Sequence, residues 1–71
     1  MTEKERLVRG YLTKRMRERA ELQTDEAQAH FRKFWEWLRG KLPILSVTYA
    51  VRLLLFEMEE YMQGRKEVPA T

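Results

Sequence analysis

The chain has 71 residues, of which 44% are hydrophobic and 35% charged, and its net charge is +3. It contains no cysteine and one histidine, which excludes disulfides and thiolate metal sites and argues against structural zinc. A chain this short buries a core that barely offsets the entropy of ordering its residues, so we expect oligomerisation or a partner to complete it.

The first predicted element is a helix over residues 2–22. Thr2 and Glu5 have the spacing of a capping box, in which each caps the other's backbone N–H. The apolar stripe repeats every fourth residue at Val8, Leu12 and Met16. The stripe lapses at Arg19. Gly10 in the helix interior marks either a close approach to another helix or a weak position, which costs about 1 kcal/mol relative to alanine.

The second predicted element is a helix over residues 25–41. Thr24 or Asp25 supplies a side-chain oxygen to the free N–H groups of its first turn, and Gly40 and Pro43 end it. Its core-facing stripe spans about 100° of the helix. The members of this stripe are Ala27, Phe31, Phe34, Trp35, Leu38 and Leu42.

The third predicted element is a helix over residues 46–63. Ser46 is its expected N-cap, and Gly64 its expected left-handed stop. One apolar face is made by Val47, Ala50, Val51, Leu54, Met58, Tyr61 and Met62. Further apolar side chains lie outside that face at Tyr49, Leu53, Leu55 and Phe56. A helix that is apolar nearly all round is buried on more than one side, so this helix is predicted to be central and to be completed by a second chain or a partner.

These elements predict an all-α three-helix bundle with antiparallel neighbours, because the loops between them are short. Residues 1–64 are expected to form a single helical domain. Residues 65–71 have no hydrophobic periodicity and are expected to form a mobile tail.

The apolar residues that the intramolecular stripes do not use predict a protein interface, which we place at Trp37, Tyr49, Leu53 and Phe56. Trp37 lies off the stripe of its helix, on the side of His30, Lys33 and Lys41. Three interpretations remain open for Trp37. It either lies over the edge of the bundle with a lysine stem against its ring, anchors a protein interface, or stacks on a nucleic-acid base.

The basic residues of the first helix favour a second hypothesis, a nucleic-acid contact through Arg6, Arg9, Lys14 and Arg17. Residues 1–23 carry seven Lys or Arg against four Glu, whereas residues 43–64 carry one against three. The glutamates that interrupt the basic face would repel phosphate. A solvated face with internal ion pairs and an acidic protein partner are the alternatives.

No arrangement of residues indicates catalysis. His30 has no companion at metal-ligand or catalytic spacing, and Glu57 belongs to a charged patch without a paired base. Arg52 is the single basic residue of the third helix's expected range, which argues against a DNA-recognition helix. We therefore expect no enzyme activity, no cofactor and no metal.

The function indicated by these patterns is that of a small non-catalytic protein-protein interaction or regulatory assembly module that self-associates. The alternative is a nucleic-acid-binding accessory protein. The N-terminal segment is not a signal peptide, since it carries charge on every turn. The longest apolar run, residues 53–56, is too short to cross a bilayer. A cytoplasmic protein without membrane contact is the expectation.

Overall fold

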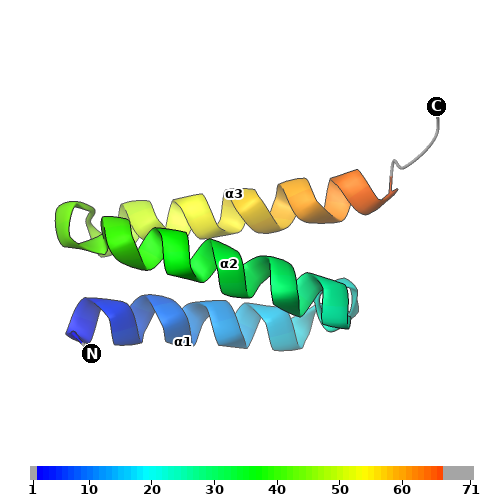
Figure 1. Ribbon diagram of the computed structural model, residues 1–71, viewed down its shortest axis with the longest axis horizontal. Coiled ribbons are helices and arrows are strands. Elements are labelled where there is room, and N and C mark those ends of the chain that lie inside the picture. The colour runs from blue at the N-terminus through cyan, green and yellow to red at the C-terminus, as the bar shows by residue number, and fades with distance from the viewer. Residues whose placement is uncertain (1, 67–71) are drawn as a thin grey trace.

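The computed structural model describes residues 2–66, the last two by their backbone alone. Within that range the chain forms no strand. The elements are α1 (Glu3–Glu18), the 3-10 helix η1 (Ala20–Leu22), α2 (Asp25–Lys41), the 3-10 helix η2 (Leu42–Ile44) and α3 (Val47–Lys66). Figure 1 shows α1 and α3 running in the same direction, with α2 antiparallel to both. The predicted all-α three-helix bundle is confirmed.

The three helices begin where side-chain caps predict. The backbone N–H of Glu5 donates to Thr2 Oγ1 at 3.1 Å, and the Thr2 N–H donates to Glu5 Oε1 at 2.9 Å, which completes the capping box. Thr24 caps α2 in the same way, and Ser46 Oγ accepts the Tyr49 N–H at 3.1 Å at the start of α3. Each cap satisfies a donor that the helix itself leaves free.

The first helix ends at Glu18 and does not reach Leu22 as predicted. Arg19 adopts an extended conformation, with φ −125° and ψ 117°, at the position where the apolar stripe lapses. The chain then turns through η1, and the Leu22 side chain becomes fully buried. Gln23 Nε2 donates to the Arg17 carbonyl at 2.9 Å and satisfies an acceptor at the end of α1.

The third helix does not stop at Gly64 but continues to Lys66. Gly64 has no positive φ, so the left-handed stop that the sequence predicts does not form. Arg65 and Lys66 are residue types that favour a helix, which is consistent with this continuation. The predicted tail therefore loses its first two residues to α3, and residues 67–71 lie outside the described part of the chain.

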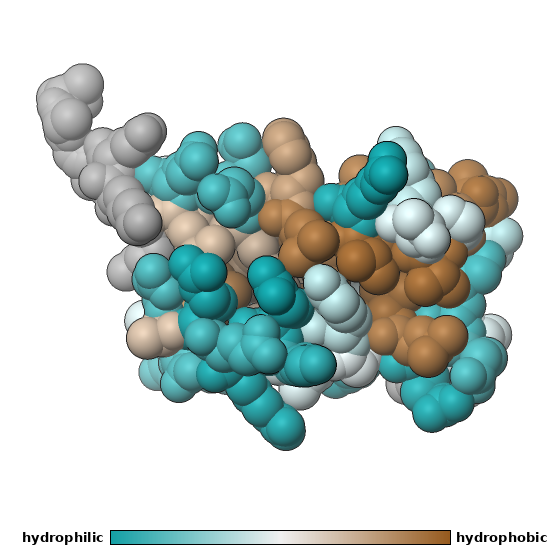
Figure 2. All heavy atoms as spheres, turned by 180° about the vertical axis from the view of Figure 1, so that it is seen from behind, coloured by the Kyte–Doolittle hydropathy of each residue, from teal (hydrophilic) through white to brown (hydrophobic). Residues whose placement is uncertain are grey.

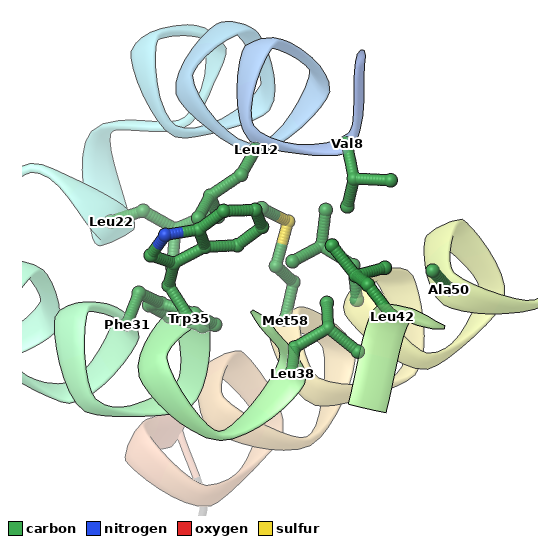
Figure 3. Close-up of a cluster of buried hydrophobic side chains, with 10 residues drawn as sticks. Val8, Leu12, Leu22, Phe31, Trp35, Leu38, Leu42, Ala50 and Met58 are labelled. Carbon is green, nitrogen blue, oxygen red and sulfur yellow. The ribbon is translucent and has the colours of Figure 1, made fainter. Parts of the chain in front are cut away.

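One hydrophobic core joins all three helices (Figure 3). Its members are Val8, Leu12, Leu22, Phe31, Trp35, Leu38, Leu42, Ala50, Leu54 and Met58. By its number of buried residues, the third helix ranks above α1, which contributes Val8 and Leu12, but below α2. Among the described residues, α2 contributes Ala27 and three core residues, against three from α3. Of the described large apolar side chains of α3, Tyr49 and Phe56 stay exposed at the surface.

Candidate protein interface

A hydrogen-bonded pair sets the register of α2 against α3. His30 Nε2 lies 2.8 Å from Glu57 Oε2, and both side chains are about one-third exposed. The two helices run antiparallel, so residues that follow His30 lie level with residues that precede Glu57. Trp37, seven residues after His30, is therefore level with Ala50. This register places Trp37 level with the stretch of α3 that contains Tyr49 and Leu53.

Helical spacing puts the predicted interface residues of α3 along one strip. Leu53 precedes Glu57 by four residues and Tyr49 precedes Leu53 by four, so all three share the flank of α3 that faces α2. Phe56 lies next to Leu53 on the outward side. We call Trp37, Tyr49, Leu53 and Phe56 the α2–α3 strip.

The α2–α3 strip is largely open to solvent. The exposed fractions are 50% for Trp37, 51% for Tyr49 and 64% for Phe56. Leu53 differs from the prediction, because it is partly buried against the core. Leu53 lies on the flank of α3 that faces α2, and from there its side chain packs against the hydrophobic core.

The Trp37 side chain is half covered. The Phe34 ring centroid lies 5.6 Å from that of Trp37, and Lys41 Nζ lies 5.9 Å from the Trp37 ring. The first of the three interpretations of Trp37, with a lysine side chain against its ring, is therefore present, although half of the Trp37 side chain remains exposed. His30 is not part of this cover, because its ring packs 4.8 Å from both Phe31 and Tyr61 and bonds Glu57. The pairing of His30 with Glu57 was not predicted, since nothing local in the sequence links them.

Two further exposed apolar residues were missed by the sequence reasoning. Leu7 is 49% exposed and Ile44 is 82% exposed. Figure 2 shows a hydrophobic area at the end of the bundle that carries η2, seen from the side opposite to Figure 1. Neither residue belongs to an apolar stripe of a predicted helix. That was the one feature of the sequence from which their exposure could have been predicted.

The basic residues predicted on the first helix do not act as one surface. Arg6 is held by Glu3 at 2.7 Å, and Lys14 is exposed elsewhere on α1. Arg9 and Arg17 instead line a cleft of about 800 Å³ between α1 and α2. The guanidinium carbon of Arg9 lies 5.8 Å from the Trp35 ring.

That cleft contains a third arginine, Arg32 of α2, which the sequence reasoning missed. Within residues 2–66, no carboxylate lies within ion-pair distance of Arg9, Arg17 or Arg32. Glu36 also lines the cleft and lowers its positive potential. The floor is apolar but closed, because Leu12, Leu22, Phe31 and Trp35 are each at most 6% exposed.

At the other end of the bundle, α1 is tied to α2 by polar contacts. Arg39 Nε donates to Glu5 Oε2 at 2.9 Å, and the Glu5 side chain is only 15% exposed. The hydrogen bond from the Thr2 backbone and that from Arg39 lower the pKa of Glu5 below its ordinary 4.5. Lys4 Nζ donates to the carbonyls of Leu42 and Leu45, at 2.9 and 2.7 Å, which satisfies acceptors around η2.

The described residues hold no cluster of three or more histidine or acidic side chains that could bind a metal ion. None of the helices between residues 2 and 66 has the length and apolar content of a membrane span. Compared with protein-family models, curated proteins and solved structures, the chain shows no significant match to any of them.

Proposed function

We propose that this chain is a non-catalytic helical module that acts in the cytoplasm by protein-protein interaction, and that it self-associates through the α2–α3 strip. The observation that carries the proposal is the exposure of three aromatic side chains, Trp37, Tyr49 and Phe56, along one side of so small a bundle. Tryptophan and tyrosine are enriched among the residues that dominate protein interfaces.

The size of the chain supports self-association. A core supplied by 71 residues rarely provides more than about 3–5 kcal/mol of stability. Burying further apolar surface contributes about 25 cal/mol per Å², so covering the open aromatic rings of the strip would add stability that the monomer lacks. The absence of cysteine removes disulfides as another source.

The test is the native mass in solution, measured by sedimentation over a range of protein concentrations. We expect a particle of at least twice the chain mass of 8.7 kDa. Phe56→Glu should return it to the mass of one chain, because a charge within the strip is costly to bury unless an opposite charge pairs with it.

Ile44→Glu is the matched control for this experiment. It makes the same kind of change at a residue that is 82% exposed but lies in η2, outside the strip. It should leave the native mass unchanged. A wild-type chain that sediments at 8.7 kDa at every concentration would reject self-association.

The second candidate is a nucleic-acid-binding accessory role, which the three arginines of the α1–α2 cleft support. Phosphate binding by such residues weakens steeply as salt rises, because counterions are released. Arg17→Glu combined with Arg32→Glu should then abolish binding to mixed-sequence RNA or DNA, whereas Phe56→Glu should not. Failure of the wild-type chain to bind either nucleic acid at about 50 mM salt would reject this role.

A further inference from the structure

The solvent-facing side of α3 carries two regularly spaced charged residues, which contribute no ion pair between the described residues of the bundle. Tyr49, Phe56 and Gln63 recur at intervals of seven residues and so lie on one side of the helix. Arg52 and Glu59 are also seven residues apart and run along one flank of that side. All five residues are exposed.

These two charges have little to bind within one chain. Among the residues that the structure describes, Arg52 has no ion-pair partner. For the Glu59 side chain, the described part of the chain offers one polar contact, a long hydrogen bond of 3.4 Å donated by Gln63 Nε2. An arginine and a glutamate two turns apart on the same flank cannot reach each other, since two turns span about 11 Å.

We propose that α3 pairs with α3 of a second copy of this chain in an antiparallel, two-fold symmetric arrangement centred between Leu55 and Phe56. Residues equally distant from that centre then face each other. Because a two-fold axis of this kind brings the same flank of both helices together, Arg52 of each copy meets Glu59 of the other. This inference rests on the proposed self-association. It adds that the partner is a second copy of the chain and that the two α3 helices are antiparallel.

The charge pattern selects this arrangement over a parallel one. In a parallel two-fold pair, the flank that carries Arg52 and Glu59 on one helix lies across the interface from the opposite flank of the other helix, so Arg52 of one copy would not meet Glu59 of the other. In the antiparallel pair both contacts are attractive. Phe56 packs near the axis, with Leu53 and Tyr49 beside it, so the exposed aromatic rings of α3 are covered by the same contact.

Charge reversal tests the pairing. Arg52→Glu and Glu59→Arg should each raise the dissociation constant of the dimer by roughly tenfold, because each places like charges at both symmetric contacts. The double variant Arg52→Glu/Glu59→Arg should return the dissociation constant to near the wild-type value. Lys14→Glu, which changes the net charge as much as Arg52→Glu does but lies on α1, is the control and should have no effect.

Cross-linking gives an independent measure of direction, since the natural chain has no cysteine to compete. Phe56→Cys should form a disulfide-linked dimer under mild oxidation, because the two copies of residue 56 lie next to the axis. Gln63→Cys should not. In the antiparallel pair its two copies are separated by roughly 22 Å along the helices, far beyond the reach of a disulfide.

The outcomes separate the geometry from the self-association on which it rests. A wild-type chain that stays a monomer rejects both. A dimer that Phe56→Glu dissociates, but that the double charge reversal does not restore, rejects the antiparallel pairing and leaves self-association intact. Equal cross-linking of Phe56→Cys and Gln63→Cys would also reject the antiparallel pairing and would indicate parallel helices.

Discussion

At the scale of single residues, Glu5 links two parts of the chain through one carboxylate. Its oxygens accept hydrogen bonds from the Thr2 backbone and from Arg39, each at 2.9 Å. These bonds favour the ionised form and lower the pKa of Glu5 from 4.5. A carboxylate with a depressed pKa contributes stability above its unfolded pKa and loses that contribution as the pH falls through the folded value.

We therefore predict that Glu5→Gln lowers the melting temperature at neutral pH, and that the difference from wild type narrows as the pH falls below 4.5. Circular dichroism melts at a series of pH values measure it. Glu36→Gln is the control, because Glu36 lies 3.8 Å from the same arginine but is 65% exposed. It should change little at any pH. A constant difference for Glu5→Gln across the whole series would contradict the role of ionisation.

The pairing of His30 with Glu57 could not be predicted from the sequence around either residue. The two lie 27 positions apart, and neither has a local motif that points to the other. Only the antiparallel return of α2 against α3 brings them to 2.8 Å. Their contact places Trp37 level with Ala50, next to Tyr49 in the sequence, so the α2–α3 strip depends on a pair that no local pattern predicts.

At the scale of elements, the interior of α1 contains a glycine without a structural reason. A Cβ atom at Gly10 would meet nothing within 4 Å, and Gly10 has no positive φ. The close approach that the sequence left open is therefore not present. Gly10 is the weak position of α1.

Gly10→Ala is accordingly predicted to stabilise the protein by about 0.5–1 kcal/mol, since alanine loses less entropy in a helix. In a chain of this size that raises the melting temperature by roughly 2–8 °C. Ala29→Gly, at an exposed position inside α2, should cost a similar amount and serves as the reverse control. A lower melting temperature for Gly10→Ala would mean that another chain approaches α1 at this position.

Helix starts and helix ends were predictable to different degrees. Thr2, Thr24 and Ser46 cap their helices as expected, because a cap requires only a side chain and a backbone N–H three residues apart. The ends of α1 and α3 were wrong. The first helix ends at Glu18, and the extended Arg19 and the turn after it bring Leu22 into the core. The third helix continues through Gly64 to Lys66. Residue type at these positions was therefore not enough to predict where either helix ends.

At the scale of the whole molecule, self-association would link stability to concentration. When the folded state binds a second copy and the unfolded state does not, mass action raises the melting temperature with protein concentration. We predict such a rise for the wild-type chain, and a concentration-independent melting temperature for Phe56→Glu. Calorimetry over a hundredfold range of concentration measures both. A wild-type melting temperature that does not change with concentration would contradict a dimer coupled to folding.

The number of helices, their N-caps and the apolar stripes that form the core could all be predicted from the amino-acid sequence. These features repeat within one or two turns of a helix, so local spacing is enough to predict them. Three features became visible only in the folded chain: the exposure of Tyr49 and Phe56 on α3, the cleft that Arg32 shares with Arg9 and Arg17, and the contact between His30 and Glu57. The physical reason is that burial and pairing depend on how whole helices are placed against each other, and no local pattern contains that placement.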